Sequence, residues 1–285
     1  MPNPLIVACV QLCAGPNTDA NLATLRVSIA AAAGEGAQLV CLPEYCATLD
    51  EGPRGLEVAP EPEATHGALA ALRAAAQEHR VWLSVGSLGV TAPDGRTWNR
   101  SYLLDPQGSI RARYDKLHLF DVDLAGGESY RESAVIAPGE TATVAQTPWG
   151  GLGLSICYDL RFPQLYRALA KAGASVLLVP AAFTRTTGRA HWHVLLRARA
   201  IETGCYVVAA SQCGEAPNGR LARYGHSLIV SPWGEVLADA GEAPGHVAAT
   251  LDLDRVAQAR AMIPALRHDR PFDVVREPTS APERP

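Results

Sequence analysis

Residues 149–183 constrain the fold of this chain most, and they read W-G-G-L-G-L-S-I-C-Y-D-L-R-F-P-Q-L-Y-R-A-L-A-K-A-G-A-S-V-L-L-V-P-A-A-F. The apolar run Gly151–Ile156 predicts a buried strand, and the apolar spacing after Pro163 predicts a helix that starts there. Ser175–Val179 then predicts the next strand. Cys157 therefore lies between the carboxyl end of a strand and a helix start, where open α/β sheets bind ligands.

Cys157 has two interpretations when its own neighbourhood is considered alone. The backbone N–H groups of a helix start favour a thiolate over a thiol, which would make this cysteine a nucleophile. A single cysteine is more often a small buried hydrophobe. Other cysteines in or beside strand-like runs suit that second role: Cys9, Cys13, Cys41, Cys205 and Cys213. The choice depends on what the rest of the chain places near Cys157.

Strand-like and helix-like segments alternate along the rest of the chain. Strands are predicted at residues 5–12, 38–42, 81–88, 206–211, 227–230 and 247–251, with a hairpin at 98–104 and 110–114. Helices are predicted at residues 17–33, 64–79, 191–204 and from 254 onward. Two polar segments rich in glycine or proline predict surface loops at residues 50–63 and 115–133.

No linker or break in composition interrupts this alternation, which predicts one α/β domain over residues 1–276. The last residues, 277–285, read E-P-T-S-A-P-E-R-P and are predicted to be disordered. A net charge of −4 without a basic run gives no reason to expect nucleic acid or an anionic membrane as partner. The absence of a signal peptide, of a long apolar span and of C-x-x-C pairs predicts a cytoplasmic protein.

Three predicted strand ends carry a reactive side chain. They are Glu44 in C-L-P-E-Y, Lys116 in Y-D-K-L-H and Cys157 in S-I-C-Y-D. Glu44 and Lys116 could each be a solvated loop charge if considered alone. Together the three supply what acyl transfer through a thioester requires, namely a sulfur nucleophile, a carboxylate that moves protons and a cation that stabilises the oxyanion.

The sequence resembles the nitrilase superfamily of carbon–nitrogen hydrolases over roughly residues 5–272. The segments L-P-E-Y, Y-D-K-L-H-L-F and G-L-S-I-C-Y-D-L-R-F match its three signature regions in order. The resemblance implies a four-layer α-β-β-α sandwich, a catalytic Glu44–Lys116–Cys157 triad, no cofactor, and a homodimer or larger homo-oligomer. It also implies a second glutamate near Y-R-E-S. That role falls to Glu132, with Glu128 in G-G-E-S as the competing residue.

The residues around the cysteine resemble amidases that act on 2-oxo acid amides more than nitrilases (C-W-E) or carbamoylases (C-N-D-R). Residues 195–214 are most similar to amidases of deaminated glutathione, with omega-amidases, which act on 2-oxoglutaramate, as near neighbours. The implied reaction turns a small-molecule amide into a carboxylate and ammonia through a cysteine thioester. Two residues depart from these relatives: Arg189 replaces a frequent proline and His193 a frequent glutamate. An interaction protein without catalysis is a weaker alternative, because all three triad residues are present.

Arg161 follows the cysteine by four residues and is the first candidate for substrate binding. Its guanidinium could hold a substrate carboxylate through two hydrogen bonds, or it could simply pair with Asp159. Phe183 and Thr187 follow the next strand end and could line the same pocket. The backbone N–H of Tyr158 is the expected second donor to the oxyanion.

A metal site is not expected from the sequence. His191 and His193 form an H-W-H pair, but positions i and i+2 of a helix do not share a face. G-L-S-I-C is not the G-x-S-x-G elbow of serine hydrolases, and G-G-L-G-L-S lacks the glycine spacing of dinucleotide-binding loops.

Overall fold

The computed structural model describes residues 4–52, 55–57, 59–123, 129–215 and 222–276. The predicted disordered tail at 277–285 and the competing glutamate Glu128 lie outside the described residues. Within the described chain, no helix has the length and apolar character needed to cross a bilayer.

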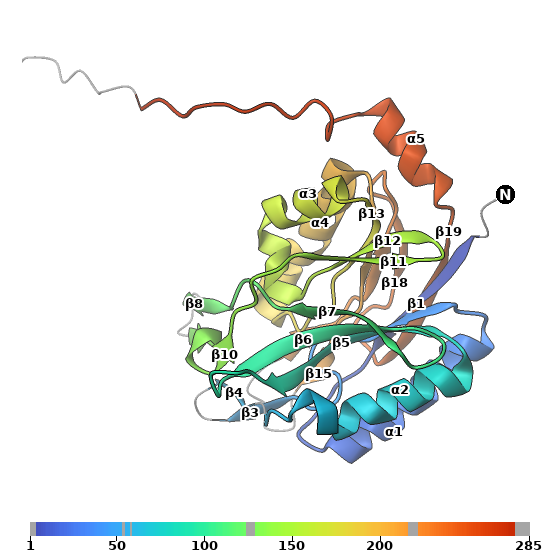
Figure 1. The fold of residues 1–285 in the computed structure, drawn as a ribbon, viewed down its shortest axis with the longest axis vertical. Helices are drawn as coiled ribbons and strands as arrows, with labels where there is room; N and C mark the ends of the chain where they lie inside the picture. The colour runs from blue at the N-terminus through green and yellow to red at the C-terminus, as the bar shows by residue number, and fades with distance from the viewer. Residues whose placement is uncertain (1–3, 53–54, 58, 124–128, 216–221, 277–285) are drawn as a thin grey trace, which may run out of the picture.

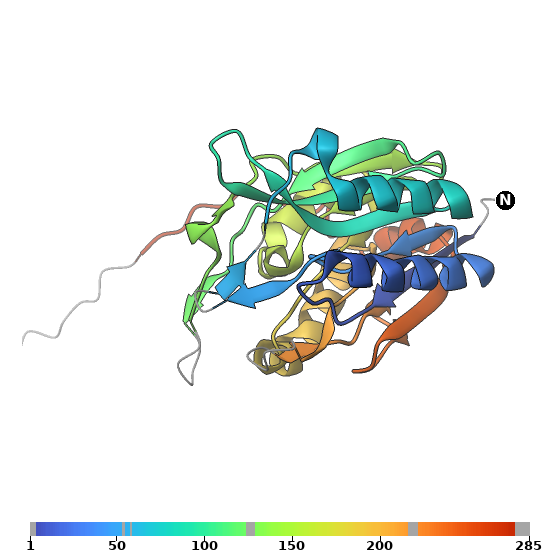
Figure 2. The same cartoon turned by 90° about the horizontal axis from the view of Figure 1, so that it is seen from below.

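The first sheet has the strand order β10-β6-β5-β2-β1-β19, and β7 pairs with β6. Its strands are β1 (Leu5–Gln11), β2 (Leu39–Cys41), β5 (Trp82–Thr91), β6 (Thr97–Leu104), β7 (Ile110–Asp115), β10 (Ile136–Ala137) and β19 (Gly245–Leu251). Helices α1 (Thr18–Gly34) and α2 (Gly67–His79) lie side by side over one face of this sheet (Figure 2).

The second sheet has the strand order β11-β12-β13-β14-β17-β18. Its strands are β11 (Thr143–Thr147), β12 (Gly150–Leu154), β13 (Ala174–Leu178), β14 (Tyr206–Ala209), β17 (Leu228–Val230) and β18 (Val236–Asp239). Helices α3 (Pro163–Lys171) and α4 (Arg185–Thr203) cover it on the side away from the first sheet (Figure 1). The predicted four-layer α-β-β-α sandwich is confirmed, and so is the parallel strand–helix–strand unit of residues 149–183.

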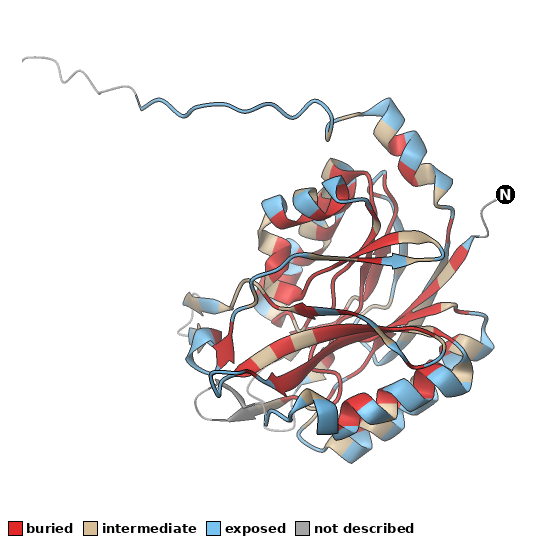
Figure 3. Cartoon of the chain, viewed as in Figure 1, coloured by how far each residue is buried: buried red, intermediate tan, exposed pale blue. Residues whose placement is uncertain are grey.

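Strand β1 shows how the four layers are held together. Val7 and Cys9 belong to the apolar cluster that both sheets share, whereas Ala8 and Val10 belong to the cluster beneath α1 and α2. Alternate residues of a strand point to opposite faces, so a strand in the middle of such a sandwich must be apolar on both. The central strands are accordingly buried along their length (Figure 3).

The structure differs from the predicted elements mainly at their starts. Helix α4 begins at Arg185 rather than at residue 191, because the Thr184 hydroxyl accepts a hydrogen bond from the Thr187 N–H and caps it. Gly188 in its first turn packs against Tyr224, whose ring lies 2.3 Å from where a Cβ would stand. A larger residue at position 188 would clash with this ring, which explains why a glycine stands inside the helix.

Helix α2, by contrast, starts later than predicted, at Gly67, because residues Glu63–Thr65 form a separate 3₁₀ turn. The two predicted surface loops contain short strand pairs. These are β3 (Asp50–Gly52) with β4 (Gly55–Glu57), and β8 (Asp121–Asp123) with β9 (Ser129–Arg131). A further pair, β15 (Cys213–Glu215) and β16 (Ala222–Tyr224), precedes β17, and the predicted last helix is α5 (Asp254–Met262).

Candidate active site

Cys157 starts a short 3₁₀ turn, Cys157–Arg161, after the end of β12. Its backbone is left-handed with φ 49°, a conformation that costs a non-glycine residue roughly 1–2 kcal/mol. The Cys157 N–H donates to the Pro180 carbonyl at 2.8 Å, two residues past the end of the neighbouring strand β13. Strain that surrounding structure enforces in this way is typical of functional sites.

Asp159 fixes this turn from within. Its fully buried carboxylate accepts hydrogen bonds from the Ile156 N–H at 2.9 Å and from the Tyr114 hydroxyl at 2.6 Å. It also accepts from the His118 N–H at 3.1 Å and lies 2.7 Å from His118 Nδ1. The aspartate thereby joins the turn that carries the cysteine to the segment that carries Lys116.

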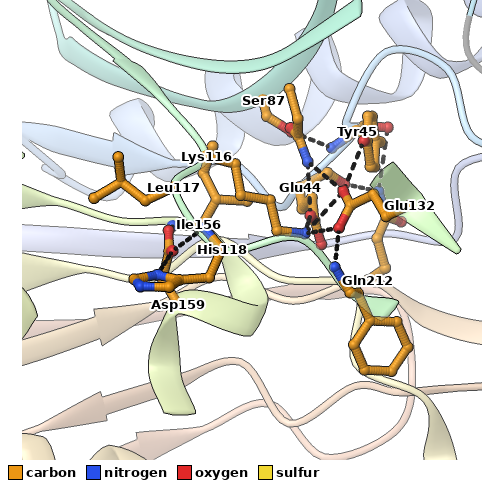
Figure 4. Close-up of polar contacts among 12 residues, drawn as sticks. Glu44, Tyr45, Ser87, Lys116, Leu117, His118, Glu132, Ile156, Asp159 and Gln212 are labelled. Atoms are coloured by element: carbon orange, nitrogen blue, oxygen red, sulfur yellow. Dashed lines mark hydrogen bonds and ion pairs between the residues drawn. The ribbon is translucent and has the colours of Figure 1, made fainter. Parts of the chain in front are cut away.

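Lys116 lies directly after β7, and its ammonium sits between two carboxylates (Figure 4). Its Nζ is 2.9 Å from Glu44 Oε1 and 3.0 and 2.9 Å from the two oxygens of Glu132. All three side chains are nearly inaccessible to water. A buried charge has to be paired, so this cluster fixes the position of each member.

Two further polar residues complete the cluster, and the sequence reasoning missed both. Asn99 Nδ2 donates to Glu44 Oε1 at 2.9 Å and to Glu132 at 3.4 Å, and the Tyr45 hydroxyl lies 3.3 Å from Glu132. Asn99 lies within β6, where the polar residues Thr97, Asn99 and Ser101 alternate along the strand and are all buried. This alternation of polar residues in an otherwise buried strand was the available signal.

The charge states follow from this packing. Burial alone would lower the pKa of Lys116, but Glu132 and Glu44 raise it well above its usual value, so Lys116 remains a cation. Burial, together with the nearby Glu44 carboxylate, raises the pKa of the Cys157 thiol well above its usual value. Lys116 and the Ala182 N–H oppose this rise only in part. Cys157 therefore rests as a thiol.

The expectation that a helix start would hold Cys157 as a thiolate is wrong. The cysteine begins a separate five-residue 3₁₀ turn, whereas helix α3 starts six residues later at Pro163. The field of a helix terminus acts mainly within its first turn, so burial dominates. The proton of the thiol must leave during attack, and Glu44 is the neighbouring base.

One cavity of about 790 Å³ opens onto this cluster. All eight residues named from the sequence line it: Glu44, Lys116, Glu132, Cys157, Tyr158, Arg161, Phe183 and Thr187. Arg189 and His193, the two departures from the resembled amidases, are not among the described residues that line it.

Arg161 is oriented by aromatic rings rather than by a carboxylate. Its guanidinium carbon lies 5.8 Å from the Tyr158 ring centroid and 5.5 Å from that of Phe183, and Nη1 is 3.3 Å from Nδ1 of His191. Within the described chain it forms no ion pair with Asp159, whose oxygens are held by Tyr114, His118 and the turn itself. The pairing of Arg161 with Asp159, considered from the sequence, is absent.

Two further arginines, Arg131 and Arg223, line the same cavity, and neither was anticipated. Arg223, on β16, is only 8 % exposed. Burial lowers its pKa to about 10, while the charge of Glu44 acts in the opposite direction. Arg223 therefore stays protonated at neutral pH. Its segment carries no recognisable motif, so only the folded chain places it at the cavity.

The model of the Carbon-nitrogen hydrolase family matches residues 6–261. The chain belongs to this family. Its members act on carbon–nitrogen bonds, and the protein is accordingly an enzyme that acts on amides.

Individual proteins that are similar to this chain support its assignment to the family. The deaminated glutathione amidase of Synechocystis sp. is 43 % identical over 272 residues, which cover 93 % of this chain and 98 % of that protein. The C. elegans NitFhit protein has a TM-score of 0.85 at 37 % identity, over 94 % of this chain and 65 % of that one. An amidase variant from Nesterenkonia sp. AN1 has a TM-score of 0.73 at 28 % identity, over 89 % of this chain and 92 % of that one. In that variant the acetamide moiety of fluoroacetamide is added covalently at the active site cysteine.

Proposed function

We propose that this carbon–nitrogen hydrolase cleaves 2-oxo acid amides of the deaminated glutathione type through a thioester on Cys157. The observation that carries the proposal is the arrangement of Cys157, Glu44 and Lys116 at one cavity, with Lys116 2.9 Å from Glu44. A thiol, a base beside it and a fixed cation are the groups that acyl transfer requires. The 43 % identical amidase supports the substrate class.

In the proposed mechanism, Cys157 Sγ attacks the amide carbon while its proton moves to Glu44. Lys116 and the Tyr158 N–H stabilise the oxyanion. The tetrahedral species collapses as Glu44 returns the proton to the departing nitrogen, which leaves a thioester. Glu44 then takes a proton from water, which attacks the thioester and releases the carboxylate and the thiol. Glu132 positions Lys116 through its ion pair.

The leaving group depends on the substrate, and this affects how activity is measured. A primary amide such as 2-oxoglutaramate releases ammonia, the product expected from the sequence. Deaminated glutathione is a substituted amide, so cleavage at the same carbonyl releases cysteinylglycine, with a free amino group, instead of ammonia. An assay of both products, by amine detection and by mass, is needed to compare the two substrates.

Two of the cationic side chains that line the cavity, Arg161 and Arg223, favour the larger substrate. We assign Arg161 to the carboxylate beside the 2-oxo group. The leaving nitrogen must face Glu44, which protonates it. The charge of Arg223 acts on Glu44 within the same cavity, so Arg223 is assigned to the side of the leaving group. Deaminated glutathione carries a second carboxylate at the end of its leaving group, which Arg223 would bind. 2-Oxoglutaramate has no such group.

The test is the ratio of kcat/KM for deaminated glutathione to kcat/KM for 2-oxoglutaramate. We expect wild type to prefer deaminated glutathione, and Arg223→Gln to lose that preference while keeping its rate on 2-oxoglutaramate. A preference of wild type for 2-oxoglutaramate would instead assign the enzyme as an omega-amidase. Absence of turnover on both substrates, on nitriles and on N-carbamoyl amino acids would favour a non-catalytic interaction protein.

We further propose that one catalytic domain acts in the cytosol as a homodimer or larger homo-oligomer. All seven cysteines are free thiols, as suits a reducing compartment. Apolar side chains are exposed on α4, at Val194 and Ile201, and on the extended segment after α5, at Phe272 and Val274. Exposed apolar groups of this kind are common at subunit contacts. Light scattering coupled to size-exclusion chromatography measures the oligomeric state directly.

A further inference from the structure

Two histidines and an aspartate meet where α4, the β16–β17 connection and the end of β18 come together. They are His193, His226 and Asp239, and one potential ligand atom from each lies within 4.8 Å of the other two. His193 Nε2 is 3.1 Å from Asp239 Oδ2, and His226 Nδ1 is 2.9 Å from Asp239 Oδ1. None of the three lines the catalytic cavity, so this cluster is separate from the proposed amidase site.

The backbone around the cluster holds these side chains in place. Asp239 Oδ1 accepts from the Gly241 N–H at 2.9 Å, and the His226 N–H donates to the Gly241 carbonyl at 2.6 Å. The His226 carbonyl accepts from Trp192 Nε1 at 2.8 Å, and His226 itself has a left-handed backbone with φ 53°. A strained residue fixed on both sides by hydrogen bonds keeps its ring in one place.

We propose that His193 Nε2, His226 Nδ1 and the Asp239 carboxylate bind one Zn²⁺ ion, with water as the fourth ligand. Imidazole and carboxylate are ligands of zinc, which is bound tetrahedrally at about 2.0–2.2 Å. Those bond lengths place neighbouring ligand atoms about 3.3 Å apart. The contacts of 2.9–3.1 Å between each histidine and Asp239 require only a small outward shift, and the two histidine nitrogens lie within 4.8 Å of each other.

The surroundings suit a bound cation. The Gly241 N–H donates to Asp239 Oδ1 at 2.9 Å and orients the carboxylate, while Asp239 Oδ2 faces His193 Nε2. The Tyr224 hydroxyl lies 3.5 Å from His193 Nδ1, where a polar partner orients a metal-bound imidazole. His193 and Asp239 are each 32 % exposed, which leaves room for a water ligand and a path of entry.

The competing explanation is a hydrogen-bonded network in which Asp239 accepts a hydrogen bond from each imidazole ring. The two explanations require different protonation states of the same two ring nitrogens. In the network both facing nitrogens carry hydrogen, whereas in a zinc site both offer a lone pair to the metal. The H-W-H pair supplies a control: His191 contacts Arg161 instead of Asp239, in keeping with the different faces of positions 191 and 193.

The experiment is a calorimetric titration of the metal-free full-length protein with Zn²⁺, repeated with Co²⁺ under visible absorption. We expect one ion per chain in wild type and in His191→Ala. In His193→Ala and in the isosteric Asp239→Asn the affinity should fall by at least about tenfold. Zn²⁺ should raise the Tm of wild type by several degrees and leave that of both cluster variants nearly unchanged.

The free thiols are the main competing ligands, and Co²⁺ distinguishes them because thiolates give a charge-transfer band that imidazole and carboxylate do not. Circular dichroism of the metal-free variants checks that they fold. Equal zinc affinity in wild type and His193→Ala, loss of binding in His191→Ala, or a Co²⁺ spectrum with the thiolate band would each overturn the site.

Discussion

Asp159 binds His118 twice, through the backbone N–H at 3.1 Å and the imidazole Nδ1 at 2.7 Å. His118 lies two residues after Lys116 and Asp159 two residues after Cys157. A fully buried carboxylate thus sets the distance between two catalytic candidates that are far apart in the sequence. Its role is to position the nucleophile and the cation relative to one another.

Asp159→Asn keeps the shape of this side chain but removes the charge that accepts these hydrogen bonds. We expect a loss of stability of roughly 1.5–3 kcal/mol, the range for hydrogen bonds to a charged group. Turnover of charged and neutral amides should fall together, because the whole triad is displaced. Urea unfolding and a two-substrate assay measure both effects, and wild-type stability with full activity would contradict the positioning role.

Cys157→Ala should abolish turnover and leave the fold intact. Cys157→Gly should be equally inactive but more stable than the alanine variant by about 1 kcal/mol, because glycine adopts φ 49° without strain. Thermal unfolding of the two variants side by side measures the difference. A glycine variant less stable than the alanine variant would show that the turn is not strained.

Glu44→Gln lacks the base that takes the thiol proton, so it should acylate slowly even with an activated ester, whose leaving group needs no proton, and should then accumulate the thioester. The glutamine can still contact Lys116 and Asn99, but it cannot take a proton from water to complete hydrolysis. Intact-mass measurement detects the acyl adduct on the enzyme. Glu132→Gln is the matched control; it should lower the rate without accumulating the adduct. Rapid turnover of the ester by Glu44→Gln would rule out this carboxylate as the base.

Arg161→Ala should lower kcat/KM for 2-oxo acid amides by about 30-fold to several thousand-fold, since truncating one partner of a buried charge pair costs roughly 2–5 kcal/mol. Arg161→Lys should also be poor, because an ammonium cannot form two parallel hydrogen bonds with a carboxylate. A neutral amide without the carboxylate should be a weak substrate that is indifferent to both substitutions. Equal losses on charged and neutral amides would refute the assignment.

Glu63 should make stability depend on pH. Hydrogen bonds from Arg113, and then Arg100, lower its pKa to about 2, and its side chain is only 27 % exposed. A pKa depressed in the folded state contributes stability above the unfolded value of about 4.3 and loses it as pH falls toward 2.

Glu63→Gln should therefore cost roughly 1–3 kcal/mol at pH 7, and the difference from wild type should shrink between about pH 5 and pH 2. Asp94→Asn, which removes an exposed ion pair with Arg96, is the control and should have a much smaller effect. Denaturant unfolding at several pH values measures both. A Glu63→Gln penalty that is independent of pH would mean that packing, not charge, causes it.

The sequence predicted most of what depends on local pattern. Apolar runs ended by glycine or proline located β12, α3 and β13, and reactive residues at strand ends pointed to Glu44, Lys116 and Cys157. Features that arise only from tertiary contact were missed. Asn99 is one polar residue within a strand and Arg223 lies in a segment without a motif. The protonation state of Cys157 depends on burial, which the spacing of residues along the sequence does not reveal.

The pairing of Lys116 with two carboxylates bears on the direction of the reaction. One ammonium and two carboxylates leave the cluster with a net charge of −1 around a neutral thiol. The amide group that reacts is neutral, but hydrolysis creates a new anion at the same place. Two like charges about 4 Å apart repel by about 4 kcal/mol at an effective dielectric constant near 20. This repulsion, which the charge of Arg223 near Glu44 offsets in part, favours release of the acid and opposes amide synthesis.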